Sequence, residues 1–171
     1  MERTLVLLKP DCVQRRLVGE VIGRLEAKGL KIAAMKMLRV SPQQARRMYA
    51  EHEGKYFHAP LVTFITSSPV VAMVVEGTEA VAVCRAMLGP TDGKSAPAGT
   101  VRGDYGLSSR NNLVHASDSP ASADRETAIF FAPGEVLEYE LGIGQWIWWE
   151  PPARGGPGPG GTANPQIGDT G

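Results

Sequence analysis

The chain has 171 residues, a length that fits one domain able to fold without a metal ion or a disulfide. Lys plus Arg and Asp plus Glu both number 18, and no polybasic stretch or membrane-length apolar run is present, which argues against nucleic-acid binding and membrane association as the main activity. The two cysteines and three histidines lack the spacing of a zinc site, so we expect a soluble cytoplasmic protein with reduced thiols.

The first half of the chain alternates short apolar runs with amphipathic segments. The run 4–8 predicts a buried strand that ends at Lys9-Pro10-Asp11. Residues 19–28 predict a helix that stops at Gly29, and residues 32–40 predict a second strand. A further helix begins at Ser41, where the sequence Ser-Pro-Gln-Gln is typical of a capping box.

The second half repeats this pattern around a long polar loop. We expect a short helix over 60–65, a buried strand over 70–75 and a helix over 80–87 that Gly89 ends. Residues 89–112 are rich in Gly, Ser, Asn and Pro, and a loop of this length in a compact domain is usually functional or disordered. A helix from Asp118 to about Thr127 and a fourth strand over 128–131 complete the pattern.

The order strand, helix, strand, strand, helix, strand predicts an α+β, ferredoxin-like βαββαβ fold, with an antiparallel four-stranded sheet flanked by helices. The composition changes after Glu150, since more than half of residues 151–171 are Gly or Pro. We therefore expect one folded domain over 1–150 and a disordered, low-complexity tail over 151–171.

Several separated motifs in the folded region resemble those of the nucleoside diphosphate kinases. They are Arg-Thr-Leu-Val-Leu-Leu-Lys-Pro-Asp (3–11), Ser-Pro-Val-Val-Ala-Met (68–73), Gly-Thr-Val-Arg-Gly-Asp-Tyr (99–105) and Asn-Leu-Val-His-Ala-Ser-Asp-Ser (112–119). The resemblance implies transfer of the γ-phosphate of a nucleoside triphosphate, mainly ATP, to a nucleoside diphosphate in nucleotide synthesis. The resemblance also implies a ping-pong cycle through a phosphohistidine.

The family's catalytic residues fall by motif on four positions of this chain. His115 would be the nucleophile, phosphorylated on the ring nitrogen nearer the backbone, and Glu126 would accept a hydrogen bond from the other nitrogen. Lys9 follows the first strand and would contact phosphate, and Tyr49 would hold the region of Lys9 and His115 in place. A neutral imidazole near pH 7 is a competent nucleophile once one nitrogen is free and the other is fixed.

The resemblance also assigns the nucleotide-binding residues. Phosphate would be bound by Lys9, Arg85, Thr91 and Arg102. Asn112 would contact the ribose, and Phe57, with Leu61 beside it, would stack on the base, which favours broad base tolerance. Mg²⁺ is implied as the cofactor, held by phosphates and water rather than by a protein metal site, because the sequence has no cage of carboxylates.

The chain departs from the family pattern at a few positions. Cys12 and Arg16 stand where glycine is usual, and Ala116 follows the histidine where glycine is also usual, which would cost stability if that position requires a positive φ. Ser109 replaces an apolar residue expected over the base, so base affinity is expected to be weaker.

Two other classes of function stay open on the sequence. One is a binding or regulatory protein on the same fold that has lost catalysis, which the presence of the full set of site residues disfavours. The other is an RNA-binding module, which the missing aromatic strand pattern and the neutral charge disfavour. The family forms tetramers or hexamers, so we expect nucleotides and further copies of this chain as partners, without choosing between the two assemblies.

Overall fold

The computed structural model describes residues 1–147, apart from the side chains of Gly144 and Gln145. One compact unit comprises Met1–Tyr139, and the chain from Glu140 forms a second unit, in which α8 (Gly144–Ile147) is described. The predicted tail over 151–171 lies outside the described residues. None of the helices described between residues 1 and 147 combines the length and apolar character that crossing a bilayer requires.

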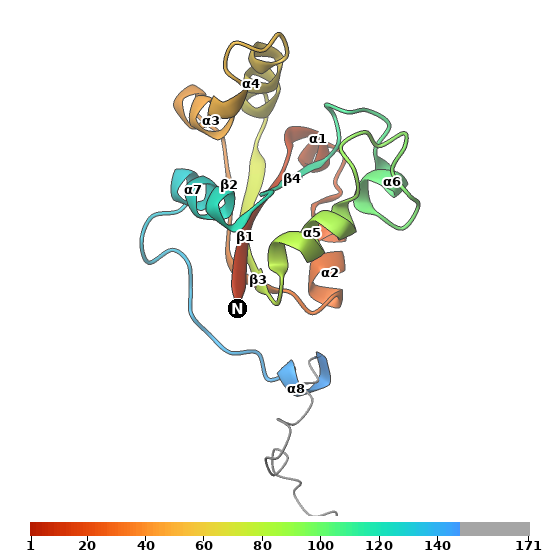
Figure 1. The fold of residues 1–171 in the computed structure, drawn as a ribbon, viewed down its shortest axis with the longest axis vertical. Helices are drawn as coiled ribbons and strands as arrows, with labels where there is room; N and C mark the ends of the chain where they lie inside the picture. Colours follow the sequence, from red (N-terminus) through yellow and green to blue (C-terminus); the bar gives the residue numbers. More distant parts are fainter. Residues whose placement is uncertain (148–171) are drawn as a thin grey trace, which may run out of the picture. The chain divides into compact units, whose positions relative to one another are not determined.

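A four-stranded antiparallel sheet forms the centre of the first unit (Figure 1). Its strands are β1 (Glu2–Leu8), β2 (Lys31–Leu38), β3 (Val70–Gly77) and β4 (Val114–Ala116), in the spatial order β2-β3-β1-β4. In β1, Leu5 pairs with Val74 of β3 and Leu7 pairs with His115 of β4. This order and these directions confirm the predicted ferredoxin-like fold.

Helices cover both faces of this sheet, with α5 and α2 on one side and α7 on the other (Figure 1). The face bearing Val6 and Leu8 is covered by α1 (Pro10–Gln14), α2 (Val18–Ala27), α5 (Ala80–Leu88) and α6 (Val101–Tyr105). The face bearing Leu5 and Leu7 is covered by α3 (Pro42–Met48), α4 (His58–Thr66) and α7 (Pro120–Phe130), and the 3-10 turn η1 (Ala50–His52) lies between α3 and α4 in the chain.

The position of β1 inside the sheet explains its continuous apolar sequence. Leu5, Val6, Leu7 and Leu8 are fully buried because alternate side chains enter the two opposite cores. Burial of each such side chain contributes about 1.5–3 kcal/mol relative to exposure. The strand therefore fixes the place of Lys9, the residue that directly follows it.

The predicted fourth strand over 128–131 is wrong. Residues 128–130 continue α7, in which Glu126, Ile129 and Phe130 are buried at the i, i+3, i+4 spacing of one helix face. The fourth strand is β4, whose three residues are too short to produce a recognisable alternation. As a result His115 lies on the edge strand of the sheet, and not in a loop.

The segment over 89–112 contains a short helix, α6, which the sequence did not predict. Thr100 caps this helix, since its hydroxyl accepts a hydrogen bond from the Gly103 amide at 3.0 Å. Gly89 ends α5 as predicted, with φ of 79°, and a Cβ there would lie 2.6 Å from the Thr100 hydroxyl oxygen. The capping box at Ser41 and Gln44 is confirmed as well.

The residues that stand in place of glycine behave differently from one another. Arg16 has φ of 59°, a left-handed conformation that glycine adopts at lower cost. Ala116 lies in β4 and has no positive φ, so alanine is tolerated after His115 without backbone strain. Alanine at position 116 therefore does not cause the loss of stability that a positive φ would have produced.

Candidate active site

A cavity of about 490 Å³ opens where β1, β4, α3, α5, α6 and α7 approach one another. Its lining includes eight of the nine residues expected at the site: Lys9, Tyr49, Arg85, Thr91, Arg102, Asn112, His115 and Glu126. Phe57 lies outside this lining, as far as the described residues define it. The fold thus brings together side chains that are spread over more than a hundred positions of the sequence.

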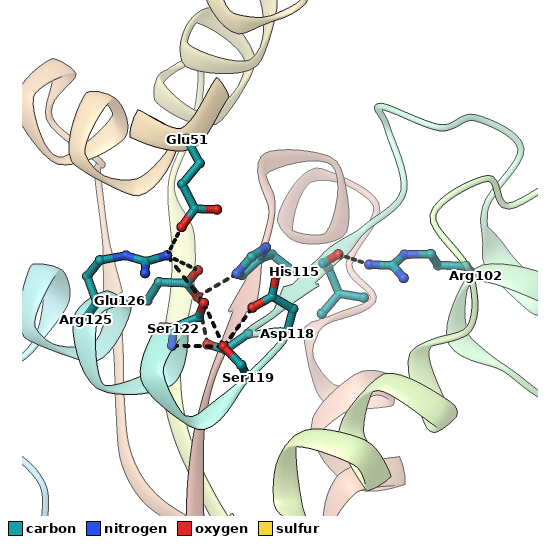
Figure 2. A network of polar contacts seen from close by, with 10 residues as sticks. Glu51, Arg102, His115, Asp118, Ser119, Ser122, Arg125 and Glu126 are labelled. Atoms are coloured by element: carbon teal, nitrogen blue, oxygen red, sulfur yellow. Dashed lines mark hydrogen bonds and ion pairs between the residues drawn. The ribbon is translucent and has the colours of Figure 1, made fainter. Parts of the chain in front are cut away.

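His115 is held by one ring nitrogen (Figure 2). Its Nε2 atom lies 2.8 Å from Oε2 of Glu126, and the Ser117 hydroxyl donates to the same oxygen at 2.7 Å. Among the residues that the structure describes, no hydrogen-bond partner is found for Nδ1 of His115. With Nε2 donating, Nδ1 carries the lone pair, which makes it the nucleophilic nitrogen.

Glu126 is only 5% exposed, so its charge depends on its neighbours. Burial by itself would raise the pKa of Glu126, but the hydrogen bond and charge of His115, with the Ser117 hydroxyl, hold the pKa below its usual value. The same carboxylate acts on Tyr49, where burial first and the charge of Glu126 second raise the pKa of the hydroxyl. At neutral pH the site therefore contains an ionised Glu126 and a neutral Tyr49.

Lys9 and Asn112 form a buried polar pair on the floor of the cavity. The Lys9 ammonium donates to Oδ1 of Asn112 at 2.7 Å, and Nδ2 of Asn112 donates to the backbone oxygens of Thr91 and Ser109. Burial, and next the positive charge of Arg102, lower the pKa of Lys9 to about 8, while the carboxylate of Asp11 acts in the opposite direction. Among the residues described, no carboxylate forms an ion pair with Lys9, and an anionic ligand would supply a direct partner for this cation.

Arg102 is positioned by the backbone around the site. Its guanidinium donates to the carbonyl oxygens of Gly89, Asn112 and Val114, which fix its plane beside β4. Burial lowers the pKa of Arg102 to about 10, and the charge of Arg85 contributes in the same direction. Lys9, Arg85 and Arg102 are therefore three of the four Lys and Arg side chains that line the cavity, the fourth being Arg125, and binding of a polyphosphate requires such a group of cations.

The backbone between Asn112 and His115 is strained. Leu113 has φ of 73°, and the Val114 amide donates to the Asn112 carbonyl at 2.8 Å, closing a three-residue γ-turn. A bulky residue in this region of conformational space costs about 1–3 kcal/mol, and such outliers concentrate at functional sites. The turn leads directly into β4 and the nucleophile.

The mouth of the cavity carries an ion pair that sequence reasoning missed (Figure 2). Arg125 of α7 bonds to Glu51 of η1 at 2.8 Å and lies 3.9 Å from Oε1 of Glu126. The signal available in the sequence was the i, i+3, i+4 spacing of Ser122, Arg125 and Glu126 on one helix. The helix predicted from Asp118 begins at Pro120, with Ser119 as its N-cap, because the Ser119 hydroxyl accepts a hydrogen bond from the Ser122 amide.

The residues that line the cavity next to Ser109 differ from those expected to bind the base. The Phe57 ring packs edge-on against the ring of His52, with the centroids 5.4 Å apart, and it is His52 that lines the cavity together with Leu61 and Ser109. No signal in the sequence placed His52 in the lining of the cavity.

The cavity does not contain a recognisable protein metal centre. Within the described part of the chain, no group of three or more His, Cys, Asp or Glu side chains is arranged to hold a metal ion. A divalent cation that keeps several waters and binds mainly through substrate phosphates fits such a site.

The comparisons with known proteins agree with this geometry. The family model described as "Nucleoside diphosphate kinase" matches residues 2–136. A nucleoside diphosphate kinase of Pelotomaculum thermopropionicum is 53% identical over 148 residues, covering 86% of this chain and 99% of the relative, and one of Archaeoglobus fulgidus is 56% identical over 150 residues, covering 88% and 99%.

The similarity extends to solved structures. A nucleoside diphosphate kinase from Halobacterium salinarum, in complex with CDP, superposes with a TM-score of 0.85 at 45% identity, covering 86% of this chain and 99% of that chain. The fold and the site together define a phosphotransferase of the α+β class. The chain belongs to the nucleoside diphosphate kinase family.

Proposed function

We propose that this chain transfers the γ-phosphate of a nucleoside triphosphate, mainly ATP, to a nucleoside diphosphate through a phosphohistidine at His115, and so supplies CTP, GTP, UTP and deoxynucleotides. The observation that carries the proposal is the hydrogen bond between Nε2 of His115 and Glu126, which leaves the lone pair on Nδ1 of a ring that lines the same cavity as Lys9, Arg85 and Arg102. Phosphoryl transfer requires mainly such positioning and charge stabilisation.

Each residue of the site has a separate role in the proposed mechanism. Lys9, Arg85 and Arg102 neutralise the phosphates, with Thr91 as a further hydrogen-bond donor. His115 attacks the γ-phosphorus through Nδ1, the bond to the leaving β-phosphate oxygen breaks, and Glu126 stabilises the imidazolium charge that develops. A nucleoside diphosphate then attacks the phosphohistidine in the reverse sense, with Asn112 contacting the ribose and Tyr49 keeping the wall of the cavity in place.

Mg²⁺ is the cofactor of this proposal, because it neutralises phosphate charge when bound with the nucleotide. The absence of a metal cage among the described residues fits a cation held by phosphates and water. Removal of Mg²⁺ with a chelator should therefore abolish turnover, and adding the ion back should restore it without refolding.

The intermediate provides the decisive test. The protein is incubated with γ-labelled ATP and then chased with unlabelled GDP, and the label should be acid-labile, base-stable and removed by GDP. His115→Ala should carry no label, whereas His58→Gln, which alters a histidine outside the cavity, should be labelled normally. Wild-type turnover in His115→Ala would exclude this mechanism and favour the non-catalytic binding protein.

Base recognition is proposed to be weak. The part of the cavity bounded by His52, Leu61 and Ser109 offers few groups to read a base edge. Phe57 behind His52 remains the proposed stacking residue, and Phe57→Ala should raise the KM for nucleotides by about 5- to 100-fold if stacking contributes the usual amount per base. Rates with ADP, GDP, CDP and UDP should lie within about two orders of magnitude, since only sites that read base edges reject analogues more strongly.

Assembly and location complete the proposal. Met35 and Met37 on the edge strand β2 are 55% and 61% exposed, which supports a homo-oligomer, a tetramer or a hexamer that light scattering can distinguish. The two cysteines are free thiols, in keeping with a cytoplasmic enzyme. The kinase domain is proposed to comprise residues 1–150, because the composition changes after Glu150, and every residue of the proposed site lies between Lys9 and Glu126.

A further inference from the structure

The motif Lys9-Pro10-Asp11 contains an acidic residue that the proposed mechanism does not use. Asp11 lies in the first turn of α1, and its Oδ2 atom accepts a hydrogen bond from the Leu113 amide at 3.0 Å. The Lys9 amide donates to the Leu113 carbonyl at 2.8 Å. Both backbone polar groups of Leu113 are thus held by this motif, which is about a hundred residues away in the sequence.

Leu113 is the central residue of the γ-turn described above. Its φ of 73° is unfavourable for a bulky side chain, and the residue is fully buried. Such a conformation persists only where the surrounding structure holds it. Asn112, the first residue of the turn, binds the Lys9 ammonium, and His115 directly follows Val114, the last residue of the turn. The conformation of Leu113 therefore sets the position of the His115 ring relative to Lys9.

We propose that Asp11 is a positioning residue of the phosphotransfer reaction, which holds the Leu113 turn and thereby aligns His115 with Lys9 and Asn112. This inference rests on the function proposed above. A carboxylate suits the role because a charge-assisted bond to a backbone amide is shorter and stronger than a neutral one. Without it, the Leu113 peptide can relax toward an ordinary conformation and move β4 relative to the end of β1.

Burial and charge support this role of Asp11. The second oxygen, Oδ1, is buried and has no hydrogen-bond partner among the described residues, so the carboxylate is directed into the protein and not into solvent. The charge also acts on Lys9, whose pKa it raises against the larger effects of burial and Arg102. An acidic group placed only to cap α1 would not need the bond to Leu113, and α1 has only five residues.

The test compares three variants of the full chain. Asp11→Ala removes the hydrogen bond and the charge, and Asp11→Asn keeps an oxygen acceptor without the charge. Glu135→Ala is the matched control, because Glu135 also accepts from a backbone amide, that of Ala132, and also faces a lysine, Lys36, but lies outside the cavity. Labelling of His115 is measured in single turnover at saturating ATP, and kcat and KM are measured separately.

Asp11→Ala should slow the labelling of His115 by about a hundred-fold, the loss that a misplacement of about 1 Å produces, with a smaller change in KM. Asp11→Asn should recover a large part of this loss, and Glu135→Ala should react like the wild type. In both Asp11 variants the decrease of kcat/KM at alkaline pH should occur at lower pH, since the carboxylate charge of Asp11 no longer supports the protonated form of Lys9. A residue that contributed only to stability would leave the pH of this decrease unchanged.

Hydrogen exchange supplies a readout that does not depend on turnover. The Leu113 amide should exchange slowly in the wild type and faster in Asp11→Asn, while the amides of β3 keep their protection. Wild-type labelling rates in Asp11→Ala, an Asp11→Asn variant no faster than Asp11→Ala, or unprotected Leu113 in the wild type would each overturn the inference. A wild-type protein that forms no phosphohistidine would instead overturn the proposed function.

Discussion

Replacing Glu126 by glutamine tests how much of the reactivity of His115 depends on one buried charge. The carboxylate oxygen Oε2 accepts two hydrogen bonds, from His115 at 2.8 Å and from Ser117 at 2.7 Å. Glutamine has nearly the same shape, and its amide oxygen can accept both bonds, but without the charge. The substitution therefore removes the electrostatic part of the interaction and leaves most of the packing.

The magnitude follows from the change in charge at His115. The ring becomes positively charged as Nδ1 bonds to phosphorus, so the carboxylate contributes more in the transition state than in the ground state. A hydrogen bond to a charged group contributes about 1.5–3 kcal/mol and one between neutral groups about 0.5–1.5 kcal/mol, so making the acceptor neutral costs about 1–1.5 kcal/mol, and each 1.4 kcal/mol corresponds to a factor of ten in rate. Labelling of His115 should then slow by about 5- to 12-fold, with little change in nucleotide affinity.

Rapid-mixing measurements with γ-labelled ATP provide the assay, and Glu135→Gln provides the control. Glu135 pairs with Lys36 at 2.7 Å on the surface, away from the cavity, so its loss should leave labelling unchanged. Melting curves of both variants show whether the fold is retained. If Glu126→Gln labels at the wild-type rate while folded, the carboxylate does not support His115 in the transition state and the assignment of its role is wrong.

Three further outcomes follow from the structure. The kcat/KM for ATP should fall as the pH rises through about 8, where Lys9 loses its proton in the free protein. The value of kcat should fall only at higher pH, because bound phosphate stabilises the charge of Lys9. In Lys9→Gln the decrease of kcat/KM near pH 8 should be absent. Arg16→Gly should stabilise the fold by up to about 1 kcal/mol, or roughly 2–4 °C in Tm, since Arg16 has φ of 59°, whereas Arg15→Gly, at φ of −83°, should not. A chain that ends at Glu150 should catalyse like the full chain, and a loss of activity on this truncation would show that later residues contribute to the site.

The sequence alone was sufficient for most of the fold. The run 4–8 predicted β1 because a strand buried on both faces requires apolar side chains at every position. Gly89 and the capping box at Ser41 predicted the ends of helices, since these signals depend on local backbone geometry. Local signals failed at 128–131, where an apolar run fits a helix and a strand equally well, and at β4, which is too short to show a period.

The sequence predicted those residues of the site that lie in the separated motifs. The motifs around Lys9, Arg102, Asn112 and His115 identified the groups that line one cavity, because phosphate transfer requires these chemical types in any arrangement. The sequence did not indicate that His52 lines the cavity and Phe57 does not, because only packing decides which of the two rings faces the cavity.

Tertiary structure alone decided the contacts that give these residues their properties. The bond from Asp11 to Leu113 and the ion pair from Glu51 to Arg125 join segments that no local pattern relates. The lowered pKa of Lys9 likewise depends on burial and on Arg102, which lies far away in the sequence. Sequence determines which side chains are available and where regular structure begins and ends. Proton affinity and orientation arise only when the folded chain removes water from around those side chains and places other charges beside them.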